Sequence, residues 1–280
     1  MAIYRHQFLI FFASTLTVFA FLYSDGNRKP VSNGQYVALG SSFAAGIGLG
    51  PRASGSPVHC FRTTAGYPAL VAQRQALRLV DMTCSGSTSA HILDGGQLLL
   101  GPQLAAVGPQ ARLITITTGG NDVNYIGDLM AASGGIGGLV GWFNGPMKPA
   151  ADRPYNRVRE NLKRIAAHVR IKAPQARVVF VSYPAIFPEH GNCAATGVSD
   201  LQARISRDVA RRLADVTREA AVDANALLVD MAALSQGHDA CSQSPWVNGA
   251  VPTYGTAFHP NSPGSAAMAK AVFKVLGFGQ

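Results

Sequence analysis

Five short apolar runs recur along the chain, each bounded by turn residues and separated from the next by a longer segment. They cover residues 36–39, 77–82, 113–117, 177–182 and 226–230. Short, almost continuously apolar runs are typical of strands buried on both faces of a sheet. Because helical patterns lie between them, the sequence predicts an α/β fold with a mainly parallel five-stranded sheet.

Two of the intervening segments, 158–169 and 201–216, place apolar residues three and four positions apart and predict amphipathic helices. A closing helix is expected over 263–276, with Asn261 or Ser262 as its N-cap and Pro263 in its first turn. Segment 123–154 fits no element. We expect it to form either a lid or wall of a substrate site or a plain surface insertion, and its apolar part at 136–143 would suit an acyl chain.

The N-terminal residues have the pattern of a targeting segment. Arg5 and His6 precede an apolar stretch over 8–23, and polar residues return from Ser24. This pattern predicts a secretory signal peptide, or a membrane anchor if it is not cleaved. We therefore expect a signal peptide or N-terminal membrane anchor over 1–25, a linker over 26–35 and one folded domain over 36–280. The expected location is secreted, periplasmic or in the cell envelope.

Four well-separated cysteines in an exported chain predict disulfides. Their spacing leaves three pairings open, of which we favour Cys60–Cys84 with Cys193–Cys241. No cluster has zinc-ligand spacing, so no metal site is expected. The formal net charge of +9 comes without a basic run interleaved with aromatic residues, which argues against nucleic acid as a partner.

Small polar residues directly follow three of the expected strands, at the sheet edge where ligands of such folds bind. Ser41 and Ser42 lie on the first turn, where a nucleophilic hydroxyl would be exposed. Gly86 would let a backbone N–H approach a substrate oxygen closely, and the Asn121 amide would be a neutral donor to an oxyanion. His259, just before the closing helix, would be the general base. Each residue alone also fits a structural role, as a cap, a turn or a packed histidine.

Together these residues resemble the SGNH hydrolases, also called the GDSL family, whose blocks carry Ser, Gly, Asn and His in this chain order. The most specific matches are residues 119–122 and 259–261, and the resemblance covers the chain from position 36 onward. It looks closest to secreted, disulfide-bearing esterases and lipases of the actinobacterial type. The resemblance implies a three-layer α/β/α sandwich of the flavodoxin-like kind, and it implies no cofactor.

The resemblance also implies roles for the four residues. Ser42 would be the nucleophile and His259 the base, while the oxyanion hole would consist of the Ser42 and Gly86 backbone N–H groups and the Asn121 amide. The usual Gly-Asp-Ser is Gly-Ser-Ser at 40–42 here, which keeps Ser41 as the fallback nucleophile.

A second departure concerns the acid that usually lies three residues before the histidine. That position is Thr256, and no Asp or Glu follows Asp239. Something must still fix the imidazole tautomer. We expect the Thr256 backbone carbonyl to accept the Nδ1–H of His259, with Asp230 and Asp239 as more distant candidates.

The expected activity is hydrolysis of a small-molecule or lipid ester through an acyl-enzyme. Three alternatives stay open: an acyltransferase, a carbohydrate acetylesterase and a non-catalytic binding protein on the same scaffold. Membrane association would come through the N-terminal segment, and the sequence predicts no particular oligomeric state.

Overall fold

The computed structural model describes residues 31–134 and 146–277 of the 280-residue chain. The signal peptide or anchor expected over 1–25, the first half of the linker over 26–35 and the whole apolar segment 136–143 lie outside the described residues. Among the helices of the described part, none is both long and apolar enough to cross a bilayer.

A single sheet of five parallel strands forms the centre of the protein, in the order β2-β1-β3-β4-β5. Each strand coincides with one of the five apolar runs, so the predicted parallel sheet is confirmed. The strands are β1 (Tyr36–Gly40), β2 (Leu79–Asp81), β3 (Leu113–Thr117), β4 (Arg177–Val181) and β5 (Leu227–Val229).

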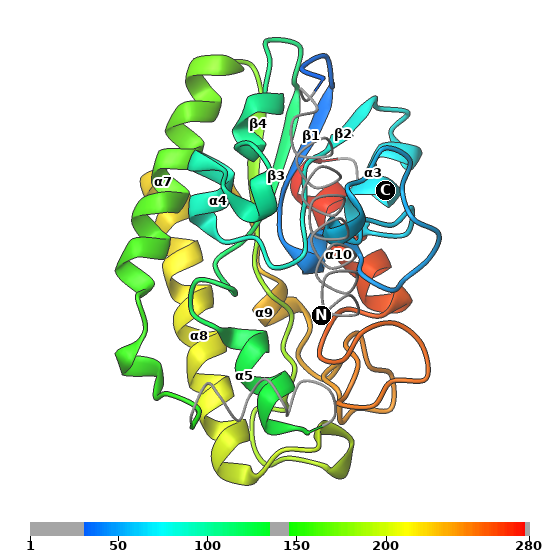
Figure 1. The fold of residues 1–280 in the computed structure, drawn as a ribbon, viewed down its shortest axis with the longest axis vertical. Coiled ribbons are helices and arrows are strands. Elements are labelled where there is room, and N and C mark those ends of the chain that lie inside the picture. The colour runs from blue at the N-terminus through cyan, green and yellow to red at the C-terminus, as the bar shows by residue number, and fades with distance from the viewer. Residues whose placement is uncertain (1–30, 135–145, 278–280) are drawn as a thin grey trace, which may run out of the picture.

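Helices cover both faces of this sheet, which makes the three-layer sandwich expected from the resemblance. Figure 1 shows α4 (Ser89–Asp94), α7 (Tyr155–Lys172) and α8 (Asp200–Asp223) on one side. On the other side lie α3 (Tyr67–Arg74) and α10 (Ser262–Val275).

The alternation of side chains along the strands divides the core into two apolar clusters. On β1, Val37 and Leu39 belong to the cluster beneath α7 and α8, while Tyr36 and Ala38 belong to the one beneath α3 and α10. Successive side chains of a strand point to opposite faces, and here both faces are covered, so every residue of β1 is buried. This explains why the runs are continuously apolar.

Helices α8 and α10 begin where polar side chains accept from their free N–H groups. Ser199 and Gln202 form a reciprocal capping box at the start of α8. Asn261 caps α10 by accepting from the Gly264 N–H at 2.9 Å, which decides between the two expected caps.

Segment 123–154 differs from its prediction, because part of it is helical. Helix α5 (Tyr125–Ala132) lies inside it, with Ile126 and Leu129 buried in the core next to α8. The helix has only eight residues and starts after Asn124, whose backbone is left-handed at φ +51°. A helix this short, without a capping side chain, leaves little periodic signal in a sequence.

Candidate active site

The candidate nucleophile turn, residues 40–42, follows β1 at the carboxyl edge of the sheet. Gly40 ends this strand at φ +148°, and a Cβ there would lie 2.4 Å from the Thr117 carbonyl oxygen of β3. Only glycine fits so close to the neighbouring strand. The Ser41 N–H then donates to Thr117 at 3.0 Å, and the short helix α2 (Ser42–Ala45) starts directly after it.

Ser42 and His259 meet across 217 positions of sequence, with Ser42 Oγ 2.8 Å from His259 Nε2. The histidine lies in the loop before α10, and its ring centroid is 4.9 Å from that of Phe43. Both residues are largely buried, with exposed fractions of 8% for Ser42 and 5% for His259. A hydroxyl oxygen this close to an imidazole nitrogen is the arrangement that a serine nucleophile and its general base require.

The carbonyl that orients His259 is that of Ala257, not of Thr256, so the expected partner was wrong by one residue. His259 Nδ1 lies 2.7 Å from the Ala257 oxygen. The Thr256 oxygen instead accepts from the side-chain amide of Asn248 at 3.1 Å and from the backbone N–H of His259 at 3.3 Å. Because Thr256 receives this turn-forming backbone bond, its carbonyl is committed to the turn, and the next carbonyl faces the ring.

This arrangement determines the charge state of the imidazole. Burial lowers the pKa of His259 to about 4, and the hydrogen bond to Ala257 only partly opposes this shift. A carbonyl stabilises the Nδ1–H but brings no negative charge to offset the desolvation of an imidazolium. His259 is therefore neutral at neutral pH, with Nδ1 protonated and Nε2 able to accept the Ser42 proton.

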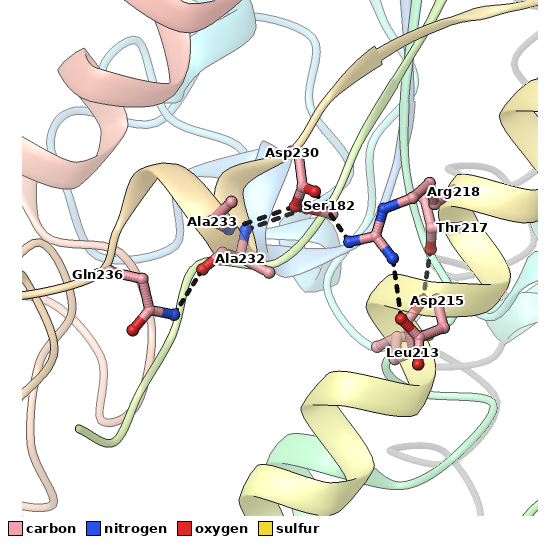
Figure 2. A network of polar contacts seen from close by, with 9 residues as sticks. All are labelled: Ser182, Leu213, Asp215, Thr217, Arg218, Asp230, Ala232, Ala233 and Gln236. Atoms are coloured by element: carbon pink, nitrogen blue, oxygen red, sulfur yellow. Dashed lines mark hydrogen bonds and ion pairs between the residues drawn. The ribbon is translucent and has the colours of Figure 1, made fainter. Parts of the chain in front are cut away.

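The two more distant acid candidates are committed elsewhere. Figure 2 shows Asp230 at the end of β5, where it binds Arg218 of α8 at 2.9 Å and caps the short helix α9 (Met231–Leu234) through the Ala233 N–H. Asp239 accepts from the backbone N–H of Cys241 at 2.9 Å. Both carboxylates therefore stabilise loops at this edge of the sheet, and the ring nitrogen of His259 faces a carbonyl.

Ser41 points away from the histidine. Its hydroxyl lies 3.2 Å from the hydroxyl of Tyr183, and the residue is only 1% exposed. Of the two adjacent serines, only Ser42 therefore faces a base, and this geometry favours it as the nucleophile.

The loop that carries Gly86 runs alongside the nucleophile turn. The Cys84 N–H donates to the Gly40 carbonyl at 3.0 Å, continuing the β1–β2 pairing beyond the strand end. Gly86 itself has φ +82°, a left-handed backbone that favours glycine. The Cys60–Cys84 disulfide and the bond from the Ser85 N–H to the Cys60 carbonyl hold this loop from the outside.

Asn121 joins the loop after β3 to the loop that carries Gly86. Its side-chain amide donates to the Ser87 carbonyl at 2.8 Å. An amide nitrogen carries two hydrogens. The bond to Ser87 uses one of them, so the other is available to donate to a substrate oxygen. The neighbouring Asp122 accepts from the N–H and hydroxyl of Ser89 at the start of α4, which makes it a structural clamp between the same two loops.

Two buried polar residues of the site were missed by the sequence analysis. The Gln103 amide accepts from the Gly40 N–H at 2.8 Å and donates to the Gly40 carbonyl at 3.0 Å and to Ser87 Oγ at 2.9 Å. Tyr183 lies between the nucleophile turn and the Asn121 loop. Tyr183 lies two residues after the end of β4, a position that could have marked it, whereas Gln103 lies in a 3₁₀ turn with no distinguishing pattern.

The two disulfides are Cys60–Cys84 and Cys193–Cys241, which is the favoured pairing. The second disulfide joins two points of the chain between β4 and α10. The loop that carries Cys241 leads to Trp246, whose carbonyl accepts from the Asn261 N–H at 3.0 Å. Both disulfides thus restrain loops at the edge of the sheet that carries Ser42 and His259.

Comparison with known proteins gives a consistent set of relatives. A family model described as the GDSL-like Lipase/Acylhydrolase family matches residues 38–267. The chain is 34% identical to Lipase 2 of Streptomyces coelicolor over 263 residues, covering 86% of this chain and 85% of that lipase. Among solved structures, phospholipase A1 from Streptomyces albidoflavus has a TM-score of 0.69 at 26% identity, covering 88% of this chain and 98% of that one. The extracellular lipase of Streptomyces rimosus has a TM-score of 0.68 at 28% identity, with coverages of 88% and 99%.

Proposed function

Because the chain belongs to the GDSL-like lipase/acylhydrolase family and is a carboxylic ester hydrolase, we propose that it cleaves esters through an acyl-enzyme on Ser42. The observation that carries this proposal is the 2.8 Å contact between Ser42 Oγ and His259 Nε2. The proposed machinery is a dyad whose imidazole is oriented by the Ala257 carbonyl.

In the first step, Ser42 Oγ bonds to the ester carbonyl carbon while its proton passes to His259 Nε2. The tetrahedral intermediate then collapses, the bond to the alcohol oxygen breaks, and the imidazolium returns the proton to that oxygen. Water repeats the sequence on the acyl-enzyme, releasing the carboxylic acid and restoring the Ser42 hydroxyl. Throughout, the Nδ1–H of His259 donates to Ala257, which keeps Nε2 directed at the serine.

The oxyanion would be held by the backbone N–H groups of Ser42 and Gly86 and by the amide of Asn121. Support comes from the bonds that bring the three loops together, Cys84 to Gly40 and Asn121 to Ser87. A preorganised donor of this kind typically contributes about 3 kcal/mol to transition-state stabilisation. The imidazolium formed in the reaction is stabilised by a neutral carbonyl and not by a carboxylate. We therefore infer that more of the reduction in the activation barrier comes from stabilisation of the oxyanion.

The substrate class that we propose is acyl esters of lipids. This rests on two relatives described as a lipase and a phospholipase A1. We further propose that the chain acts outside the cytoplasm. The two disulfides support this location, as does the similarity to an extracellular lipase, because disulfides persist in oxidising compartments.

The test is hydrolysis of a chain-length series of p-nitrophenyl esters by the unchanged protein, Ser42→Ala and the adjacent control Ser41→Ala. Ser42→Ala should lose at least about 10³-fold in kcat. Ser41→Ala keeps the Ser42–His259 contact and should retain far more activity. Higher kcat/KM on longer acyl chains would support a lipid substrate, whereas a sharp preference for acetate would favour a carbohydrate acetylesterase.

Three further outcomes would change the proposal. Hydrolysis that survives in Ser42→Ala but not in Ser41→Ala would reverse the assignment of the nucleophile. Transfer of the acyl group to an added alcohol in preference to water would indicate an acyltransferase. A protein that hydrolyses none of the esters would contradict the proposal and favour the binding-protein alternative.

A further inference from the structure

Tyr183 is a buried tyrosine at the carboxyl end of β4, two residues beyond its last strand position. Its exposed fraction is 6%. The ring packs edge-on against Phe43, with centroids 4.7 Å apart, and against Tyr125, with centroids 6.2 Å apart. Phe43 in turn contacts the ring of His259. These contacts fix the ring directly behind the proposed dyad.

The hydroxyl of Tyr183 joins two separate loops. It lies 3.2 Å from Ser41 Oγ and accepts from the Gly120 N–H at 3.0 Å. The approach to Gly120 is so close that a Cβ there would meet the phenol ring and oxygen at 2.8–2.9 Å. Glycine is therefore needed at position 120 for the hydroxyl to reach the backbone.

The two loops have no strand pairing to hold them at this point. The last bond of the β1–β3 ladder is the one from the Ser41 N–H to Thr117. Beyond it the chains diverge, with Ser42 starting α2 on one side and Asn121 following Gly120 on the other. Tyr183 bonds the residue immediately before each of them.

We propose that Tyr183 is a positioning residue that sets the nucleophile Ser42 and the oxyanion donor Asn121 at a fixed separation. This inference rests on the proposed function, because it assigns a role within the same site. Tyr183 touches neither of these two side chains through its hydroxyl, so it acts through Ser41 and Gly120.

The bridge is uncharged, which suits its burial. Burial raises the pKa of Tyr183 to about 12, so the phenol keeps its proton at any pH where the enzyme would be assayed. Ser41 offers a hydroxyl, which can donate or accept, at the position where the family usually has an Asp. A neutral hydroxyl pair needs no counter-charge in this enclosed position.

Loss of the Tyr183 hydroxyl would act on the transition state more than on substrate binding. Without it, the buried Gly120 N–H loses its acceptor, and the Asn121 loop loses the link through Tyr183 to the serine turn. Small displacements of a donor weaken its bond to the oxyanion, which exists only in the transition state and the intermediate. The expected signature is a lower kcat at nearly constant KM.

The test compares Tyr183→Phe with Tyr36→Phe in the full-length protein, using a p-nitrophenyl ester. The control is matched: Tyr36 is fully buried, and its hydroxyl bonds Thr115 at 2.8 Å near the opposite end of β1. Each variant keeps its ring and loses one buried hydroxyl, so both melting temperatures should fall by a similar amount, about 2–4 °C. Tyr183→Phe should lower kcat about tenfold or more with KM within about twofold. Tyr36→Phe should retain the kcat of the unchanged protein.

Equal kcat in the two Phe variants would overturn the inference, and so would a loss in Tyr183→Phe that appears only as a higher KM. If Tyr183→Phe does not fold, Ser41→Ala removes one of the two bonds and must show the same selective loss of kcat, to a smaller extent. Ser42→Ala distinguishes failure of the Tyr183 inference from failure of the proposed function. If it abolishes hydrolysis while Tyr183→Phe is unaffected, only the inference fails; if it leaves hydrolysis intact, the proposed function itself fails.

Discussion

The Nδ1 atom of His259 lies 2.7 Å from the backbone carbonyl of Ala257, so an uncharged oxygen orients the imidazole that we propose as the base. Burial of the ring is not offset by a carboxylate, and the pKa of His259 is lowered to about 4. The dyad needs the neutral imidazole, which is the form present above this pKa. We therefore expect kcat/KM to stay on its plateau from neutral pH down to about pH 5 and to fall to half near pH 4.

The pH dependence of kcat/KM on a neutral ester measures this directly, with circular dichroism at each pH to show that the protein stays folded. An acidic limb with its midpoint at 6.5 or above would contradict the assignment, because it would mean that the imidazolium is stabilised as if a carboxylate faced it.

Thr256 is expected to be dispensable as a side chain. Its carbonyl belongs to the turn before His259, and Thr256→Ala keeps that carbonyl. We predict a kcat/KM within about threefold of the unchanged protein. The half-buried side chain would lose one long hydrogen bond, to the Ile47 carbonyl at 3.4 Å, and that bond lies outside the proposed dyad. Asn248→Ala is the informative contrast, because its side chain binds the carbonyls of Tyr254 and Thr256 and so holds the histidine loop.

Asn248→Ala should lower kcat/KM more than Thr256→Ala does, and the two variants are compared on the same ester with melting temperatures as the check on folding. A loss of about 10³-fold in Thr256→Ala with the fold intact would show that its side chain takes part in catalysis.

Gln103 should matter for stability and for catalysis together. Its amide satisfies both backbone groups of Gly40 and also reaches Ser87. Gln103→Leu would leave the buried Gly40 N–H without its acceptor, at a cost of about 1–3 kcal/mol, while the Gly40 carbonyl would keep its bond from the Cys84 N–H. Thermal unfolding should show a clear drop in melting temperature, and kcat should fall because the nucleophile turn loses the bridge through Gln103 to Ser87. A variant with unchanged melting temperature would contradict the geometry.

The Cys60–Cys84 disulfide should stabilise the protein and preserve the oxyanion loop. It closes a loop with a sequence separation of 24, for which chain entropy predicts a contribution of about 3.5 kcal/mol. Replacing both cysteines with serine should lower the melting temperature by roughly 7–14 °C. Because Ser85 and Gly86 follow Cys84 directly, kcat should also fall at temperatures where the variant is still folded. Activity equal to the unchanged protein at those temperatures would argue that the disulfide has no part in shaping the site.

The sheet could be predicted from the sequence because strands buried on both faces leave continuous apolar runs. All five were found, and the disagreements at their ends are of one or two residues, as with β5 at Leu227–Val229 against an expected 226–230. The long helices α7 and α8 were equally visible, since each has one charged and one apolar face. Helix α5 was not predicted, because its eight residues show no such division into an apolar and a charged face.

Only part of the candidate site could be predicted from the sequence. Ser42 and His259 lie at element ends on one edge of the sheet, where side chains from distant segments meet. Their choice over other residues of the same kind, such as Ser41, came from the resemblance to the SGNH blocks. Which carbonyl faces the imidazole depends on the torsion angles of a single turn, and the sequence placed it one residue too early. Gln103 could not be identified in advance, and Tyr183 could be noticed only from its place after a strand. Both matter through bonds to the backbone of Gly40 and Gly120, and the residue type of a backbone partner does not reveal such bonds.

The most direct test of the account is covalent labelling with a serine-directed phosphonate, followed by fragmentation of the modified peptide to distinguish Ser42 from Ser41. The account predicts a single adduct on Ser42, with a rate that collapses in His259→Gln because the proton of the hydroxyl then has no acceptor. An adduct on Ser41, or undiminished labelling of Ser42 in the absence of His259, would contradict the proposed dyad.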